Sequence, residues 1–227
     1  KNSSENINFG TTTGTVFEEL WILLVELVDT KVRHAMDGIK VDLVIFMIEY
    51  HILTTLRRNN MRYSSMRNLD ISNGEGVGVS LFVQGCPFHC FGCFNSDTWD
   101  FNGGKEWTEK TKNKFMKLIN RPYIKRISFL GGECLAEQNL DEILSLIKQV
   151  RNSFPKKTIW LYTGYSYSEI FRGQSLCLSQ EGLNNFKRRE IIKLCNIVVD
   201  GEYIDEQKDL TLRWRGSKNQ RVIDVKQ

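Results

Sequence analysis

The sequence predicts an α/β protein with a mainly parallel sheet. After Met61, apolar segments of strand length alternate with helical patterns, and most of the strand-like segments run into glycine. The chain of 227 residues is long enough to bury one sizeable core, or a core and a small appendage. With 41% hydrophobic and 26% charged residues, its composition is that of an ordinary soluble protein.

The first 60 residues are predicted to be an N-terminal extension, and residues 61–227 the main domain. Two apolar stretches, VFEELWILLVELV from Val16 and VDLVIFMIEYHILTTL from Val41, are interrupted by acids. No apolar run exceeds six residues, whereas a membrane span needs about 20, so we expect no span. We expect a helical hairpin, or a helix and a strand, packed on the main domain. The alternatives are a helix that docks on a partner or a membrane surface, or a non-native segment preceding an initiator Met61.

Each element after Met61 follows from its local pattern. Short apolar runs that end near glycine predict strands over residues 77–84, 124–130, 158–163 and 196–201. A helix is expected over residues 109–120. The clearest helix contains apolar residues at spacings of three and four, namely Leu140, Ile143, Leu144, Ile147, Val150 and Phe154. Asn139 is expected to cap it, with Glu142 completing a capping box.

Four loops that follow predicted strands carry the residues of chemical interest. They are the loop around Cys86, the Gly131-Gly132-Glu133 turn, the Thr163-Gly164-Tyr165 turn and the Asp200-Gly201 pair. Ligand sites of parallel sheets gather where the carboxyl ends of the strands emerge. We therefore expect these loops to share one rim.

Three of the six cysteines lie close together in the chain. Cys86, Cys90 and Cys93 have C-x3-C-x2-C spacing on a loop that also holds Gly85, Pro87 and Gly92. Cys134, Cys177 and Cys195 are dispersed, which does not resemble a disulfide framework, and no signal peptide opens the chain. We expect a reducing, cytoplasmic setting, with Cys177 as a loop thiol and Cys195 as a small core residue.

The cysteine loop is compatible with several kinds of metal centre. A structural zinc site needs four ligands, so His89 or a distant cysteine would have to complete it. Ferredoxin-type ligation also uses four cysteines, with other local spacings. Three thiolates on one loop could instead bind three irons of a cubane cluster and leave the fourth iron free for a substrate.

Charge and glycine patterns exclude two other classes of function. The net charge is +4, with six Lys/Arg against eight Asp/Glu in residues 1–60 and 25 against 19 in the remainder. This scattered surplus does not indicate a nucleic-acid partner. The glycine-rich run at residues 74–78 precedes a strand instead of opening a helix, so it is not a phosphate-binding loop.

The C-x3-C-x2-C motif resembles that of the radical S-adenosylmethionine enzymes. Five stretches resemble one family within them, the activating proteins of the anaerobic ribonucleoside-triphosphate reductase: NGEGVGVSLFVQGCPFHCFGCFNSDTW, SFLGGE, IWLYTGY, VDGEY and RWRGSKNQR. Gly92, Asn95, Thr98, Trp99 and the Trp-Arg-Gly-Ser segment narrow the resemblance to this family. It covers about residues 68–227, whereas residues 1–60 match nothing in the family.

The resemblance implies a mechanism. Cys86, Cys90 and Cys93 would ligate three irons of a [4Fe-4S] cluster, and S-adenosyl-L-methionine would chelate the fourth. One electron would cleave it to methionine and a 5′-deoxyadenosyl radical, which removes a hydrogen from a glycine of the reductase. The resemblance also implies a shortened, open partial barrel, reduced flavodoxin or a similar electron donor, an anaerobic setting and a possible homodimer.

The resemblance further implies which residues contact the substrate. The expected contacts are Gly92, Cys93 and Phe94 on the cysteine loop, and Gly131, Gly132 and Glu133 after the second strand, with Glu133 near the substrate ammonium. Cys134 replaces the usual proline of the family. We expect Cys134 not to bind iron, because a closed cluster could not bind the sulfonium substrate.

Several residues around this site have more than one possible role. His89 either tunes the cluster by a hydrogen bond or simply orders its loop. The Thr163-Gly164-Tyr165 turn is implied to line the adenosyl side. The polar C-terminal residues could form ion pairs, bind a carboxylate, dock the reductase or lie on a solvated strand; they are Arg213, Arg215, Ser217, Asn219 and Arg221.

Two alternative functions stay open at this point. The first is another radical enzyme such as the activase of pyruvate formate-lyase, which shares the cysteines but should lack the Trp-Arg-Gly-Ser ending. The second is a zinc-binding interaction module with His89 as fourth ligand. Iron content and the partner that acquires a glycyl radical would separate these possibilities.

Overall fold

The computed structural model describes residues 61–172 and 179–225. The expectations for residues 1–60, namely a helical extension, a docking helix or a non-native segment, lie outside the described residues. The prediction that Cys177 is a loop thiol also lies outside them. None of the helices in the described ranges has the length and apolar character needed to cross a membrane.

The described part of the chain forms one seven-stranded sheet in the order β3-β1-β2-β4-β5-β6-β7. Its four central strands β2, β4, β5 and β6 are parallel, as expected, whereas β1, β3 and β7 pair antiparallel at the two sides. The strands are β1 (Arg62–Asp70), β2 (Gly78–Val83), β3 (Lys105–Glu106), β4 (Arg126–Gly131), β5 (Thr158–Tyr162), β6 (Ile197–Asp200) and β7 (Arg221–Asp224). The α/β class is therefore confirmed.

The parallel and antiparallel parts of the sheet differ in their connections. The short loop 71–77 joins β1 to β2 and can only return the chain in the opposite direction. Helices connect β4 to β5 and β5 to β6, which allows parallel pairing. The four strands predicted from apolar runs are present within two residues of their expected bounds. β1 was missed because its sequence RYSSMRNLD is mostly polar and only partly buried.

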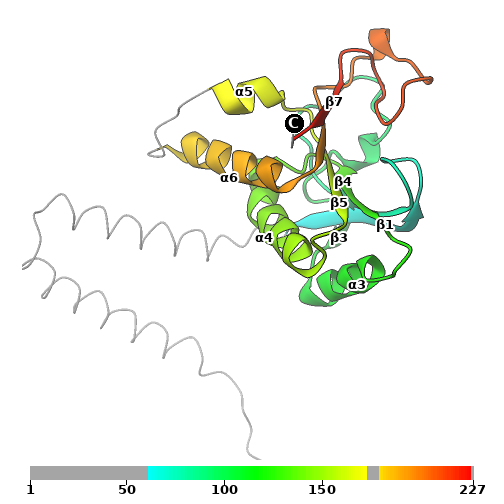
Figure 1. Ribbon diagram of the computed structural model, residues 1–227. Coiled ribbons are helices and arrows are strands. Elements are labelled where there is room, and N and C mark those ends of the chain that lie inside the picture. The colour runs from blue at the N-terminus through cyan, green and yellow to red at the C-terminus, as the bar shows by residue number, and fades with distance from the viewer. Residues whose placement is uncertain (1–60, 173–178, 226–227) are drawn as a thin grey trace, which may run out of the picture. The chain divides into compact units, whose positions relative to one another are not determined.

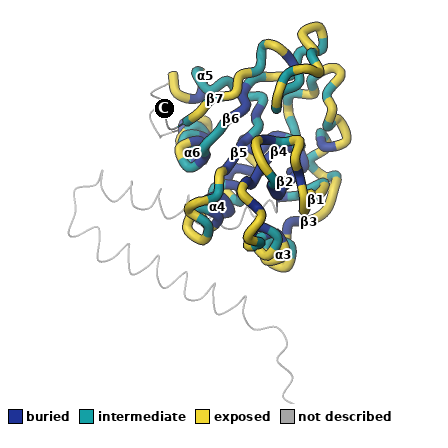
Figure 2. Tube along the Cα trace, turned by 45° about the vertical axis from the view of Figure 1, so that its right-hand side comes forward, coloured by how far each residue is buried: buried dark blue, intermediate teal, exposed yellow. Residues whose placement is uncertain are grey.

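One face of the sheet is covered by helices. The helices are α3 (Glu109–Ile119), α4 (Glu137–Ser153), α5 (Tyr167–Arg172) and α6 (Gln180–Leu194), and two 3-10 turns, η1 (Ser96–Thr98) and η2 (Asp205–Gln207), lie in loops. Figure 1 shows α3, α4 and α6 on one side of the strands, and the segment after β6 on the other. Alternate strand residues such as Leu81, Phe129 and Leu161 are buried with α4 residues Ile143 and Ile147. Figure 2 shows this dark-blue core beneath the exposed turns of the helices.

The predicted cap of α4 is wrong. The helix begins at Glu137, with Ala136 at the N-cap, so Asn139 lies inside the first turn. Asn139 is buried, and its side-chain amide donates to the carbonyl oxygens of Gln84 (3.0 Å) and Glu133 (2.9 Å). Asn139 was expected to cap the N-terminus of its own helix. Its hydrogen bonds instead connect α4 to the loops that follow β2 and β4. The capping motif cannot reveal this long-range use of the amide.

The other face of the sheet is lined by loops. Its residues alternate with the core positions and include Ser80 and Phe82 on β2, Ser128 on β4, and Trp160 on β5. Trp214 from the segment after β6 contacts Trp160 edge-on, with 4.9 Å between ring centroids. Loop 71–77 also lies against this face, because a Cβ added to Gly74 would meet Trp160 at 2.7 Å.

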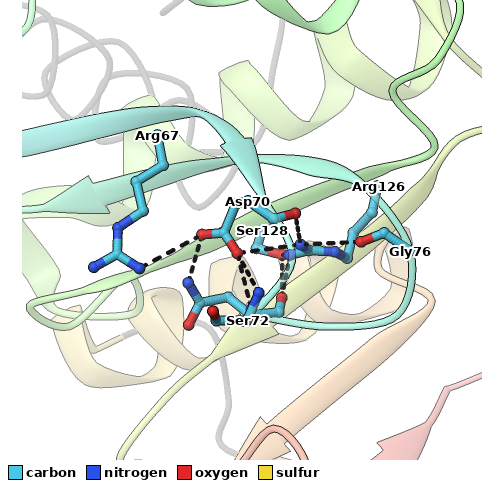
Figure 3. A network of polar contacts seen from close by, with 7 residues as sticks. Arg67, Asp70, Ser72, Gly76, Arg126 and Ser128 are labelled. Carbon is cyan, nitrogen blue, oxygen red and sulfur yellow. Dashed lines mark hydrogen bonds and ion pairs between the residues drawn. The ribbon is translucent and has the colours of Figure 1, made fainter.

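We call this loop-lined face the inner face of the sheet. A buried polar network lies at its end nearest the amino termini of the parallel strands (Figure 3). The guanidinium of Arg126, at the start of β4, donates to the Asp70 carbonyl oxygen (2.6 Å) and lies 3.3 Å from the Asp70 carboxylate. Arg126 also donates to the Asn73 carbonyl oxygen and to the Ser128 hydroxyl. Burial opposes ionisation of Asp70, but hydrogen bonds from Asn73 and Ser72 outweigh it and lower the pKa of Asp70 to about 2. The ion pair is therefore charged at neutral pH.

Candidate functional site

A cleft of about 620 Å³ lies on the inner face of the sheet and opens at the carboxyl ends of the parallel strands. Its lining brings together residues from all the loops that were expected to share a rim. They are Cys86, Cys90, Cys93, Gly131, Gly132, Glu133, Thr163, Gly164 and Gly201. The expectation of one common rim is thus confirmed for these residues, and the parallel register of the four central strands is the reason.

The cysteine loop is shaped by backbone contacts at its start. The N–H groups of Gly85 and Cys86 donate to the carbonyl oxygens of Thr98 (2.8 Å) and Trp99 (3.0 Å). Gly85 adopts φ 90°, and a Cβ there would clash with the ring of Phe101. These bonds hold the loop to the segment that follows it, so the cysteine side chains are not needed to fix the path of the chain.

The three thiols have few partners within the protein. All three are partly exposed and line the cleft. The Cys93 sulfur accepts a long hydrogen bond from the Asn95 N–H (3.4 Å), and the Cys90 sulfur lies 4.0 Å from a Glu202 carboxylate oxygen. Burial raises the pKa of Cys86 to about 11, although hydrogen bonds from the backbone of Phe88 and His89 act in the opposite direction. Binding to a metal would favour the thiolate. Soft donors without strong partners fit an iron-sulfur group.

The spacing of these thiols matters for the kind of metal centre. In residues 61–172 and 179–225, no three side chains of Cys, His, Asp or Glu surround a single ion position. The ligands of a cubane bind separate irons and need not meet at one point, whereas a mononuclear zinc site requires them to. His89 instead stacks on Trp99, with 4.8 Å between ring centroids, and adopts φ 49°. The imidazole of His89, the fourth zinc ligand considered from sequence, therefore lies against the Trp99 ring.

The glycine turn after β4 packs directly on the cysteine loop. The Gly132 N–H donates to the Val83 carbonyl oxygen (2.9 Å), and the Glu133 N–H to that of Gly85 (2.7 Å). A Cβ on Gly132 would clash with the Gly85 carbonyl, and one on Gly131, at φ 109°, would lie 2.8 Å from the Phe82 Cα. Both glycines are therefore required for this close backbone approach.

Glu133 is buried in the wall of the cleft, with 1% of its surface exposed. One carboxylate oxygen accepts from the Leu135 N–H (2.7 Å) and the Thr163 hydroxyl (2.8 Å), and the other from the Gly164 N–H (2.7 Å). Burial raises the pKa of Glu133 to about 7, although these hydrogen bonds act in the opposite direction. The carboxylate thus links the ends of β4 and β5, a contact that sequence analysis did not foresee.

Sequence analysis also missed a group of side chains that supports the cysteine loop. Phe88, inside the cysteine motif, packs edge-on against Tyr165 with 4.9 Å between ring centroids. The Arg188 guanidinium of α6 lies 4.3 Å above the Tyr165 ring and donates to its hydroxyl (3.1 Å). Phe88 lines the cleft, and a Cβ on Gly164 would meet its ring at 2.5 Å. The sequence contained one signal of this packing, an apolar residue, Phe88, within the cysteine loop.

The remaining predicted substrate contacts lie in different surroundings. Phe94 lines the cleft, packs against Tyr203 and has Lys208 at 5.2 Å from its ring centre. Gly92 is not among the residues that line the cleft; it adopts φ 72° and faces Asp205. Cys134 is fully buried in the core and does not line the cleft either. Cys195 is a buried core residue, as predicted.

The polar C-terminal residues mainly fasten the segment after β6. Arg221 pairs with the buried carboxylate of Asp200, and the Ser217 hydroxyl, also buried, accepts from the Ile204 N–H (3.3 Å). The Asn219 amide donates to the Glu202 carbonyl oxygen (2.7 Å). Arg215 lines the cleft and donates to the Gln220 carbonyl oxygen (2.6 Å). Of the readings left open, ion pairing is therefore observed for Arg221.

Comparison with known proteins agrees with this geometry. Residues 72–223 match the model of the 4Fe-4S single cluster domain family. The anaerobic ribonucleoside-triphosphate reductase-activating protein of Escherichia coli K12 is 37% identical over 164 residues, which cover 71% of this chain and 97% of that protein. The protein of the same name from Enterobacteria phage T4 is 35% identical over 71% of this chain and 93% of its own, and that from Vibrio cholerae is 34% identical over 70% and 96%. The chain therefore belongs to the family of anaerobic ribonucleoside-triphosphate reductase-activating proteins.

Proposed function

We propose that the chain is an enzyme that activates an anaerobic ribonucleoside-triphosphate reductase by generating a glycyl radical on it. The observation that carries this proposal is the cleft at the carboxyl ends of the parallel strands, into which three partly exposed thiols of one loop open. The relatives reported above are named as activating proteins of the anaerobic ribonucleoside-triphosphate reductase. The seven-stranded open sheet would be the shortened partial barrel of the radical S-adenosylmethionine enzymes.

Cys86, Cys90 and Cys93 are the proposed ligands of a [4Fe-4S] cluster with one iron free of protein donors. These residues would hold a cluster whose chemistry, when it is bound and reduced, would be one-electron cleavage of S-adenosyl-L-methionine to methionine and a 5′-deoxyadenosyl radical. That radical would take a hydrogen atom from a glycine of the reductase. Cys134 is unsuited as a fourth ligand, because it is fully buried in the core.

The chain's own residues would bind and orient the substrate. Gly131 and Gly132 expose backbone at the cleft wall, where a ligand can approach closely. Glu133 would act mainly by holding this turn against Thr163 and Gly164, since three donors already point at its carboxylate. Phe94 would shield the mouth of the cleft from water.

The proposal extends to partners and setting. The reductase would present a glycine of its main chain to the open side of the cleft, and reduced flavodoxin or a similar protein would supply the electron. A cluster this accessible calls for an anaerobic, reducing cytoplasm. A homodimer is part of the proposal by family resemblance only.

Anaerobic purification followed by two assays tests the proposed function. We expect about four irons per chain, and dithionite-dependent release of methionine and 5′-deoxyadenosine from S-adenosyl-L-methionine. Adding the anaerobic reductase should produce a glycyl doublet in electron paramagnetic resonance spectra, whereas adding pyruvate formate-lyase should not. A colourless protein with stoichiometric zinc, or a doublet only on the lyase, would refute the proposal.

A further inference from the structure

Apolar side chains remain exposed around the mouth of the cleft. Four apolar or aromatic residues line it: Phe94 on the cysteine loop and Leu210 after β6, which are exposed, and Tyr203 and Leu212 after β6, which are partly buried. We name these four residues the apolar rim. Leu210 is 79% exposed and Phe94 60% exposed, although the sheet core buries comparable residues completely. Exposed apolar residues gathered at one place mark interaction sites more often than isolated ones do.

The exposure of Leu210 is built into the local backbone. The Asp209 carboxylate accepts from the N–H (2.9 Å) and the hydroxyl (2.6 Å) of Thr211, and the Asp209 N–H donates to the Gly216 carbonyl oxygen (3.1 Å). Leu210 therefore stands at the tip of a hydrogen-bonded turn. On the other side, Phe94 is held by the Tyr203 ring at 5.4 Å. The rim is a preformed surface, which lowers the entropic cost of binding a partner.

The charges near the rim do not select a strongly charged partner. Residues 201–220 contain four acidic side chains, Glu202, Asp205, Glu206 and Asp209, and four basic ones, Lys208, Arg213, Arg215 and Lys218. With these in balance, recognition by the rim must come from apolar contact and shape rather than from steering by charge. A neutral, partly apolar protein segment fits this surface better than nucleic acid or an acidic peptide does.

We propose that the apolar rim is the docking surface for the glycine-bearing segment of the reductase, with Leu210 as its main contact. This inference rests on the proposed function. Hydrogen transfer requires the glycine Cα to come within van der Waals reach of the radical carbon, so the segment must enter the cleft that the thiols line. The residues flanking the glycine then cross the rim, because Phe94 and Leu210 line that same cleft.

The test compares two serine variants of equally exposed aliphatic residues. Leu210→Ser removes the proposed contact. Ile71→Ser is the matched control, since Ile71 is 77% exposed in the turn after β1 and does not line the cleft. The reductase of the same organism is titrated onto the cluster-loaded full chain, and affinity, glycyl-radical yield and reductase-free cleavage of S-adenosyl-L-methionine are measured for each protein.

We expect Leu210→Ser to bind the reductase about tenfold more weakly and to need correspondingly more reductase for the same glycyl signal. Leu210→Met should restore most of the affinity, because it preserves apolar area. Cleavage without reductase should equal that of the wild type in all variants. Ile71→Ser should match the wild type in every assay.

Several outcomes would overturn the inference. Wild-type affinity in Leu210→Ser, alongside an active wild type, would remove the rim from docking and leave the proposed function intact. Weaker self-association of Leu210→Ser with unchanged reductase binding would assign the rim to a second copy of the chain. A wild type that cleaves S-adenosyl-L-methionine but neither binds nor activates the reductase would refute the proposed function and the docking surface together.

Discussion

The two ends of the cleft are built from opposite kinds of contact. At the amino-terminal end, the fully buried Arg126 pairs with the Asp70 carboxylate and donates to Asn73 and Ser128, while its Nε has no hydrogen-bond partner (Figure 3). At the carboxyl end, the three thiols are partly exposed, and backbone N–H groups provide most of their hydrogen bonds. The charges of one end are paired within the protein. The other end is held by backbone hydrogen bonds and aromatic packing, and its thiols remain partly exposed.

This difference implies that stability and cofactor binding can be altered separately. Removing a partner at the closed end leaves a buried charge and should destabilise the fold. Removing a thiol should abolish the metal site with little effect on folding, because exposed side chains without strong contacts contribute little to stability. Five substitutions, from the largest expected effect to the smallest, examine this separation.

Cys90→Ala should abolish cluster binding. Loss of one proposed ligand is expected to reduce iron from about four per chain to less than one and to remove cleavage of S-adenosyl-L-methionine. In the cluster-free protein, the free energy of unfolding should change by less than about 1 kcal/mol. Iron analysis and urea denaturation check the two statements, and retention of a full cluster would exclude Cys90 as a ligand.

Asp70→Ala should have the reverse effect. It leaves Arg126 buried without its carboxylate partner, which costs about 3–5 kcal/mol of unfolding free energy. The double variant Asp70→Ala/Arg126→Met removes both charges and should recover much of this loss, as urea denaturation can measure. Iron content per folded chain should equal that of the wild type. A cost below about 1 kcal/mol would mean that the pair does not stabilise the closed end.

Gly132→Ala should weaken the cluster through the backbone. The added Cβ would clash with the Gly85 carbonyl, so the cysteine loop must move away from the β4 turn. We expect about tenfold faster loss of the cluster to a chelator, comparable to mutation of residues that orient metal ligands. Gly76→Ala is the control for backbone strain alone, since Gly76 adopts φ 75° and a Cβ there meets no atom within 4 Å. Equal rates for the two variants would contradict this role of Gly132.

Glu133→Gln should change how stability depends on pH. Burial raises the pKa of Glu133 from its usual 4.5 to about 7, so the folded state keeps a proton that the unfolded state has lost between these values. The contribution of Glu133 to wild-type stability therefore falls as the pH rises from about 4.5 to about 7 and is constant above this range. Glutamine does not titrate and lacks this dependence.

Urea denaturation of the cluster-free wild type and Glu133→Gln at about pH 5 and about pH 7.5 measures this difference. The wild type should lose on the order of 2 kcal/mol more than the variant between the two conditions. Parallel pH profiles of the two proteins would show that the carboxyl group titrates normally. Cleavage of S-adenosyl-L-methionine should fall in the variant, because the link between β4 and β5 loses an acceptor.

Cys134→Ala should have the smallest effect. Its thiol is buried in the core and lies outside the cleft lining, so its loss should cost about 1 kcal/mol of unfolding free energy. Iron content and cleavage of S-adenosyl-L-methionine should equal those of the wild type. Loss of the cluster in this variant would mean that Cys134 is a ligand and that no iron is left open.

The helices and strands that depend on local sequence patterns could be predicted. The helix around Ile143 and Ile147 and the central strands were expected within a few residues, because apolar periodicity is a local property. The β1 strand was not, because its mostly polar sequence lacks an apolar pattern. The cap at Asn139 failed because the amide is used by partners that local spacing does not show, Gln84 and Glu133.

The candidate site shows the same division. The gathering of the strand-end loops at one edge of the sheet could be predicted, since glycine and cysteine directly follow the parallel strands in the sequence. The burial of Glu133 and the support of Phe88 by Tyr165 and Arg188 were not. These contacts join residues on different elements, and a local sequence pattern contains no record of them.

The sequence by itself determined the α/β alternation, the three clustered thiols and the family resemblance, because all of these are expressed in residue type and short-range spacing. Only the tertiary structure decided that Arg126 is paired with Asp70, that Glu133 joins two strand ends, and that Leu210 stays exposed at the cleft. These depend on which distant segments the sheet brings together. Burial and hydrogen-bond partners exist only once the chain has packed.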